Sequence, residues 1–238
     1  MNSEPQSQQT AQFAPALRWT LPLFVTRENR FVAGVVVFAI AAFLYITSNW
    51  IHFYPPLVLP MTPLDSAVPF VPETIWLYVG EYFLFLTVFI IARNMENLNR
   101  YLYSILAVHI ITAVIFWMWP TTYPRELFPL PSNLDPFTFS VFDGIRKTDT
   151  PASCCPSLHV TCVYLSSFLF LDEKKGKKRI TFWIYFVWAT VISASTLTTK
   201  QHYFVDIVMG LGLALGIYYL VHRRIVFTTR IGSKLLQS

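Results

Sequence analysis

The feature that most constrains this chain is a series of apolar stretches, each close to the length of a membrane-crossing helix. Such a helix needs roughly 20 predominantly apolar residues. Six stretches approach that length: residues 31–53, 74–92, 101–119, 158–171, 180–194 and 203–221. Charged residues make up only 13% of the 238 residues, about half the share of a soluble domain. The sequence therefore predicts an all-α, polytopic membrane protein, folded as a bundle of six transmembrane helices.

The ends of the chain differ in composition from this apolar region. Residues 1–10 are polar, as disordered segments are, and residues 13–24 mix apolar side chains with prolines and an arginine, as interfacial segments do. We expect a disordered or interfacial segment at 1–30, a membrane domain at 31–222 and a basic cytoplasmic tail at 223–238. The fourth stretch is short, but Pro156 suits the first position of a helix and can begin it earlier.

The basic residues predict an orientation. With six spans, the two termini and the loops 93–100 and 174–179 share one side, and they hold 14 of the 18 lysines and arginines. The other four are Arg125, Arg146, Lys147 and Lys200. Cytoplasmic loops carry the excess of positive charge, so we expect both termini in the cytoplasm. The same bias accounts for the net charge of +5 without a nucleic-acid partner.

Two polar islands begin predicted spans on the non-cytoplasmic side. They read "CCPSLHV" at 154–160 and "TTKQHYFVD" at 198–206, and Arg125 reaches the same side. Helix N-termini favour anions, phosphate above all. His202 and Asp206 are four residues apart and share a helix face, so the carboxylate can hold the Nδ1 proton and leave Nε2 free. His159 adds a second imidazole.

Each of these residues also has a plain structural interpretation. A histidine–aspartate pair can simply cap a helix, and His159 alone would be an ordinary interfacial histidine. Together they supply a nucleophile, its orienting carboxylate, a proton donor and ligands for phosphate. These are the roles that phosphoryl transfer through a covalent histidine intermediate requires.

The two islands resemble a known family. "PSLH" and "STLTTKQHYFVD" are similar to the second and third signature motifs of the type 2 phosphatidic acid phosphatase superfamily, and most similar to its inositol phosphorylceramide synthase-like branch. The resemblance extends over most of the chain from about residue 60 and includes the six-span layout. It implies a membrane enzyme that acts on a lipid phosphate without a metal or other cofactor, with its active site on the periplasmic, lumenal or extracellular side.

The resemblance also implies roles for individual residues. His202 would attack phosphorus, Asp206 would orient it, and His159 would protonate the leaving group. Ser157 and Arg125 would bind phosphate oxygens.

The motifs are incomplete in three places. Thr196 stands where the third motif has an arginine, and Lys200 could supply that cation. Met118 and Glu126 replace the lysine and proline of the first motif.

Several further residues remain open. Glu81 lies within a span, where an acid is costly; we expect it to pair with a polar group in the bundle or to face a substrate passage. His109 is expected to be a satisfied intramembrane histidine. Cys154, Cys155 and Cys162 lack the spacing of a metal site, and free thiols are expected rather than a strained disulfide. The segment 120–156 is long for a connection and could cover the site or bind a lipid headgroup.

Three functions stay open at this point. The first is a lipid phosphatase, in which water resolves the phosphohistidine. The second is a lipid phosphotransferase, in which a lipid alcohol accepts the phosphoryl group. The third is a non-catalytic transporter or scaffold, although a transporter usually places polar groups near the bilayer midplane and here they gather at one end.

Overall fold

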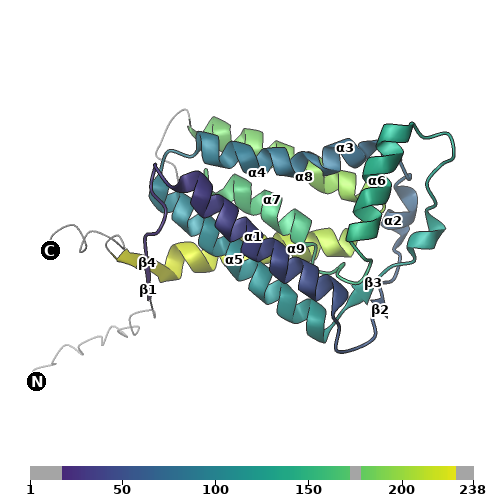
Figure 1. Ribbon diagram of the computed structural model, residues 1–238, viewed down its shortest axis with the longest axis horizontal. Coiled ribbons are helices and arrows are strands. Elements are labelled where there is room, and N and C mark those ends of the chain that lie inside the picture. Colours follow the sequence, from purple (N-terminus) through teal and green to yellow (C-terminus); the bar gives the residue numbers. More distant parts are fainter. Residues whose placement is uncertain (1–17, 172–177, 229–238) are drawn as a thin grey trace, which may run out of the picture.

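The protein is mostly helical, and the computed structural model describes residues 18–171 and 178–228. The long helices run side by side and give the molecule an elongated shape (Figure 1). They are α1 (Arg30–Trp50), α4 (Gly80–Ile91), α5 (Met95–Met118), α8 (Lys178–Thr198) and α9 (Phe204–Arg224). Short helices η1 (Pro72–Thr74) and α3 (Ile75–Tyr78) extend α4 at its start.

Five of these helical segments are long and apolar enough to cross a membrane, namely α1, the η1–α3–α4 segment, α5, α8 and α9. The predicted fourth span is α7 (Leu158–Phe168), an apolar helix of only 11 residues. The structure thus shows five candidate spans among the described residues, where the sequence predicted six. These apolar helices support a multi-pass membrane protein.

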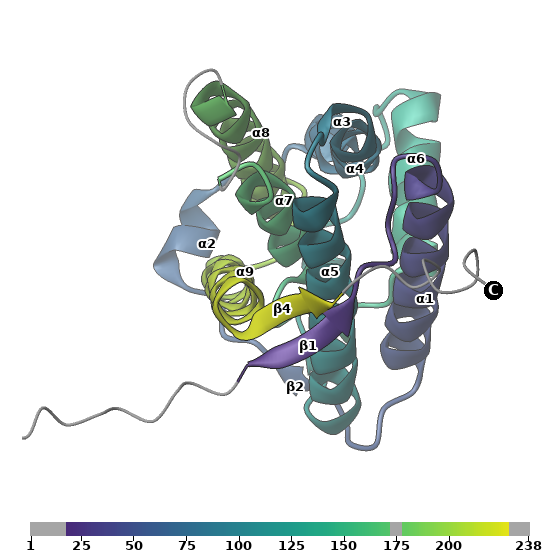
Figure 2. The same cartoon turned by 90° about the vertical axis from the view of Figure 1, so that its left-hand side faces the viewer.

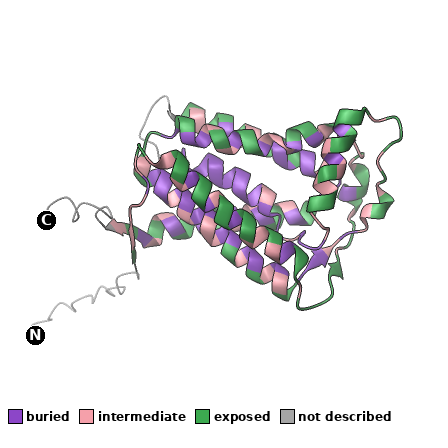
Figure 3. Ribbon diagram, viewed as in Figure 1, coloured by how far each residue is buried: buried purple, intermediate pink, exposed green. Residues whose placement is uncertain are grey.

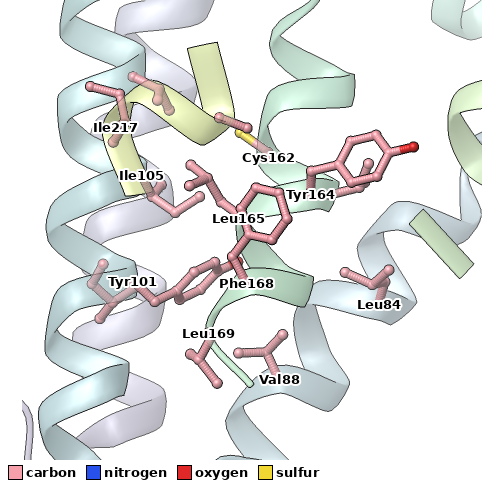
Figure 4. Close-up of a cluster of buried hydrophobic side chains, with 14 of the residues drawn as sticks. Leu84, Val88, Tyr101, Ile105, Cys162, Tyr164, Leu165, Phe168, Leu169 and Ile217 are labelled. Atoms are coloured by element: carbon pink, nitrogen blue, oxygen red, sulfur yellow. The ribbon is translucent and has the colours of Figure 1, made fainter. Parts of the chain in front are cut away.

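Helix α7 forms the centre of the bundle. All of its residues except His159 are buried, and it lies among the longer helices (Figure 3). Its side chains meet those of α4 and α5 in the main apolar core, where Leu165 and Phe168 lie near Tyr101, Ile105 and Leu84 (Figure 4). The outer helices expose large apolar residues such as Val35, Phe83 and Ile184, which suits contact with lipid.

The start of α5 corrects a predicted loop. The sequence suggested a cytoplasmic loop at 93–100 because this stretch is polar, but α5 already begins at Met95. Asn94 caps it by accepting the N–H groups of Glu96 and Asn97. The buried side chain of Asn99 accepts the N–H groups of Phe24 and Val25, so its polarity serves an internal contact and not a loop.

Two small parallel sheets depart from the all-α prediction. Strands β1 (Trp19–Pro22) and β4 (Ile225–Thr228) pair at one end of the bundle (Figure 2), with Trp19 opposite Ile225. Strands β2 (Leu57–Val58) and β3 (Thr121–Thr122) pair at the opposite end. The described part of the predicted interfacial segment is therefore tied to the end of α9.

The segment 120–156 contains a helix that was not predicted. Helix α6 (Pro136–Thr148) is amphipathic and is capped by Asp135, whose side chain accepts two backbone N–H groups. It lies across the end of the bundle, at a steep angle to α1 and α5 (Figure 1). Short helices α2 (Pro63–Ala67) and η2 (Arg125–Leu127) complete this end.

Candidate active site

His202 lies just before α9, beside the buried carboxylate of Asp206. Its Nδ1 is 3.3 Å from Oδ2 of Asp206, and the same oxygen accepts the backbone N–H of Tyr203 at 2.8 Å. Asp206 is fully buried and forms part of the N-terminal cap of α9. The helix start thus fixes the carboxylate, and the carboxylate orients the imidazole with Nε2 facing away from it.

His159, on the first turn of α7, has a carboxylate partner of its own. Its Nδ1 is 3.0 Å from Oε2 of Glu81 on α4, and both side chains are nearly buried, at 6% and 11% exposure. The ring of Tyr78 stacks on the imidazole at 4.1 Å between centroids. Nε2 of His159 has no hydrogen-bond partner within the described residues.

Glu81 was expected to pair with a polar group in the bundle, and that group is His159, a partner that the sequence did not identify. The spacing along the chain gives His159 no acidic partner, because Val163 occupies the position one turn further along α7. The only signal for Glu81 was its cost as an acid within a span. The structure therefore gives both histidines the same arrangement, a carboxylate at Nδ1.

Arg125 is the cation at this site. Its guanidinium donates to the backbone carbonyls of Asp149 at 2.6 Å and Arg146 at 3.1 Å, and to the side chain of Gln201 at 3.2 Å. Burial alone would lower the pKa of Arg125, but Tyr123 and the carboxylate of Asp149 outweigh it and raise that pKa. The guanidinium is therefore held in place and stays charged.

Ser157 and Lys200 are directed elsewhere. Ser157 is fully buried, and its hydroxyl accepts the N–H of Val160 as the cap of α7. Lys200 has a left-handed backbone, with φ of 53°, and its ammonium donates to the carbonyls of Asp65 and Val68 at 2.6 Å each. Burial lowers the pKa of Lys200. Both residues hold the polar islands in shape, where the sequence had suggested phosphate ligands.

The two polar islands are bonded directly to each other. The N–H of Ser157 donates to the carbonyl of Asp206 at 3.1 Å, and the hydroxyl of Thr161 donates to the carbonyl of Gly210 at 2.9 Å. A Cβ atom on Gly210 would lie 2.6 Å from the Ser157 carbonyl oxygen, so only glycine permits this approach. The positions of His159 and His202 are thus set by one tight helix pair.

A cavity of about 350 Å³ joins these groups. His159, His202 and Arg125 line it, Asp206 supports it from behind His202, and neither Ser157 nor Lys200 is among its lining residues. Its other wall is largely apolar and comes from α1 and α4. The residues of that wall include Phe38, Ala41, Ala42, Ile46 and Phe85.

The cavity opens on the flank of the bundle between α1 and α4. Ile46 on α1 and Tyr82 on α4 both line it, yet they are 55% and 66% exposed. Toward the other end of these helices the ring centroids of Phe38 and Phe85 are 5.2 Å apart, so these two side chains close the space between α1 and α4. The opening therefore faces the region that lipid would occupy around the bundle.

The end of α6 covers the cavity at the end of the bundle. Ile145, Thr148 and Asp149 contribute to its lining. The carboxylate of Asp149 accepts hydrogen bonds from the hydroxyl of Tyr45 and from Asn49 on α1. These contacts fasten the cover to the same helix that forms one side of the opening.

The cysteines form no disulfide and no metal site among the described residues. Cys154, Cys155 and Cys162 are free thiols, as expected from the sequence. Among residues 18–171 and 178–228 there is no group of three or more histidine, cysteine or acidic residues that could hold a metal ion. The expectation that the reaction needs no metal remains a prediction.

Comparison with known proteins identifies a family. A family model described as the PAP2 superfamily matches residues 75–220, which is more than half of the chain. The match includes α3 to α7, α8 and most of α9, and therefore both histidine–carboxylate pairs and Arg125. No curated protein matches the chain.

Proposed function

The chain belongs to the PAP2 superfamily, and from this membership we propose that it is an integral-membrane lipid phosphatase that works through a phosphohistidine intermediate. Members of this superfamily are generally phosphatases or phosphotransferases. The observation that supports the proposal best is the pair of histidines, each with a carboxylate at Nδ1, that line one cavity together with a guanidinium.

In the first step, Nε2 of His202 attacks phosphorus. The carboxylate of Asp206 accepts a hydrogen bond from Nδ1–H of His202, so the lone pair at Nε2 is available. An N–P bond forms as the bond from phosphorus to the lipid oxygen breaks, and His159 gives its Nε2 proton to that oxygen. Glu81 stabilises the protonated ring of His159 before the transfer, and Arg125 balances the charge on the phosphoryl oxygens.

In the second step, a water molecule attacks the phosphohistidine. His159, now neutral, takes a proton from the water as the new O–P bond forms and the N–P bond to His202 breaks. Inorganic phosphate leaves and both histidines return to their starting state. No step requires a metal, so we expect activity to survive chelators and vanadate to inhibit as a phosphate mimic.

The shape of the cavity supports a lipid substrate. Its polar part holds the histidines and Arg125, and its apolar part opens between α1 and α4. A phospholipid in the bilayer presents the same division, with a charged phosphate at the surface and hydrocarbon below it. Ala42 has the smallest side chain on the exposed rim of the opening, so we propose that the lipid chain passes there.

We also propose six passes, with α7 as the fourth and the active site on the non-cytoplasmic face. The non-helical segment before α7 is largely buried, including Cys154, Pro156 and Ser157. Irregular backbone is tolerated at membrane depth when protein surrounds it. A buried approach of this kind lets a helix of 11 residues complete the crossing.

A phosphotransferase is the second candidate. The cover formed by α6 and its contacts with Tyr45 and Asn49 restricts the approach of water, while the flank stays open to lipid. A lipid alcohol could therefore reach the phosphohistidine in place of water. The resemblance to the inositol phosphorylceramide synthase-like branch agrees with this alternative.

One experiment separates these functions. Purified protein is incubated with a panel of lipid phosphates, with and without lipid alcohols, while free phosphate and new phospholipids are both measured. Release of phosphate supports the phosphatase, and a new phospholipid without release supports the transferase. His202→Ala should abolish both turnover and covalent labelling by a radiolabelled substrate. Unchanged turnover in His202→Ala would exclude the proposed mechanism, and no turnover by the wild type would leave the transporter or scaffold.

A further inference from the structure

A third histidine lines the cavity and has no part in the mechanism above. His109 lies on α5, within a span, and is 8% exposed. A polar side chain at this depth is costly unless its nitrogens are used. The sequence alone suggested a fully satisfied histidine, so the partner of each ring nitrogen decides what His109 can do.

The Nδ1 atom of His109 is satisfied by its own helix. It lies 2.7 Å from the carbonyl oxygen of Ile105, one turn earlier. A carbonyl oxygen can only accept, so Nδ1 carries the hydrogen. In the neutral ring, Nε2 is then a hydrogen-bond acceptor with a free lone pair.

The Nε2 atom of His109 has no partner within the part of the chain that the structure describes. It is not among the polar atoms that are both enclosed and unpartnered. Since the residue lines the cavity, this small accessible part of the ring is open to a bound molecule. His109 thus presents one acceptor atom on an otherwise largely apolar wall.

The depth of His109 places this acceptor near the reacting groups. The N–H of Phe53 bonds to the carbonyl of Trp117, so the ends of α1 and α5 are level. His109 lies eight residues before Trp117, or about 12 Å down the helix. Phe38 lies about 18 Å below the end of α1, and its ring contacts that of Phe85 on α4. Glu81 is one turn above Phe85, so it too lies about 12 Å below the end of α1.

The acceptor atom selects the kind of group that can bind. A lone pair repels the oxygens of a phosphate anion, and a charged ring would be costly within a span, so the matching group is an uncharged donor. At the depth of Glu81, that donor is close to the phosphate and not far along a hydrocarbon chain. We propose that His109 accepts a hydrogen bond from a hydroxyl group that the lipid substrate carries on the carbon next to its phosphate-bearing carbon.

The inference rests on the proposed function for its substrate class, and it is tested with matched lipids. One is a 1-acylglycerol 3-phosphate with a free hydroxyl; the other has the same chain but a hydrogen in place of that hydroxyl. Binding to solubilised protein, by thermal shift, and kcat/KM are measured for each lipid. A hydrogen bond contributes a net of about 0.5–1.5 kcal/mol, so the wild type should prefer the hydroxyl lipid by about two- to tenfold.

His109→Leu should reduce this ratio to about one, with little change for the lipid that lacks the hydroxyl, and His109→Gln should restore part of the preference because it keeps an acceptor. His222→Leu is the matched control. His222 makes the same one-turn contact, from Nδ1 to the carbonyl of Tyr218 at 3.1 Å, but does not line the cavity, so its ratio should stay at the wild-type value.

Two results would overturn the proposal. The first is a wild-type protein with no preference, as expected if water occupies Nε2. The second is a preference that survives in His109→Leu. If the wild type hydrolyses neither lipid, the proposed phosphatase function fails, and the binding ratios still decide the role of His109.

Discussion

Replacing Glu81 with glutamine tests whether His159 is the proton donor. Glutamine keeps the length of the side chain and an oxygen that can accept from Nδ1, but it removes the negative charge 3.0 Å from the ring. The protonated form of His159 then loses its stabilising partner. Glu81→Gln should therefore slow the step in which the leaving oxygen is protonated.

The expected magnitude follows from the geometry. At an effective permittivity of 20, two charges 3.0 Å apart interact by about 5 kcal/mol, but burying them offsets much of that attraction. Hydrogen bonds to charged groups contribute a net of about 1.5–3 kcal/mol, and each 1.4 kcal/mol corresponds to about tenfold in rate. We expect kcat/KM for a lipid phosphate to fall by about 10- to 100-fold.

The assay compares two leaving groups. A lipid alkoxide needs a proton, whereas p-nitrophenolate leaves without one, so kcat/KM for p-nitrophenyl phosphate should fall by at most about threefold. Glu96→Gln is the control, since Glu96 is exposed at the start of α5 and pairs with Arg100. Equal losses for both substrates, or no loss for the lipid, would refute the role given to His159.

Four further outcomes are expected. Arg125→Ala should lower kcat by about 100-fold, and Arg125→Lys should recover little because one ammonium cannot reproduce the separate hydrogen bonds of the guanidinium; activity within threefold of wild type would contradict this. Ala42→Trp should block lipid phosphates at the opening yet spare p-nitrophenyl phosphate, and parallel losses would indicate misfolding or another entrance. Cys155 is only partly exposed and lies in the largely buried segment before α7, so its thiol should react with maleimide far more slowly than an ordinary exposed cysteine; rapid labelling would contradict it. In intact cells, Ser132→Cys should react with an impermeant reagent and Lys175→Cys only after permeabilisation, and the reverse pattern would invert the proposed topology.

The sequence predicts the helices well because their signal is local. Long apolar stretches gave α1, α8 and α9 to within four residues at each end. The prediction failed where polar side chains lie inside the bundle. Asn99 is fully buried, so the polar stretch at the start of α5 looked like a loop. Helix α6 was missed because its apolar face meets other elements and does not form a continuous apolar run.

The contacts of the candidate site likewise differ in whether the sequence can predict them. His202 and Asp206 are four residues apart, and the N-terminal cap of α9 brings them together, although His202 lies before the helix and not on it as the sequence suggested. The Glu81–His159 pair depends on the packing of α4 against α7, which no spacing along the chain reveals. The charge of Lys200 is visible in the sequence, whereas the backbone carbonyls that bind its ammonium are not.

The contact between α7 and α9 limits how chains of this kind can exchange segments. Gly210 leaves no room for a side chain against the Ser157 carbonyl, and the backbone of Ser157 bonds to that of Asp206. A crossover between residues 171 and 203 would join an α7 from one parent to an α9 from another. If the two parents differ in how far α9 is shifted along α7, the two histidines would move apart. A crossover before residue 153 keeps both helices from one parent. Recombinant libraries should therefore retain function mostly when the crossover lies before residue 153, because the two histidine motifs then come from the same parent.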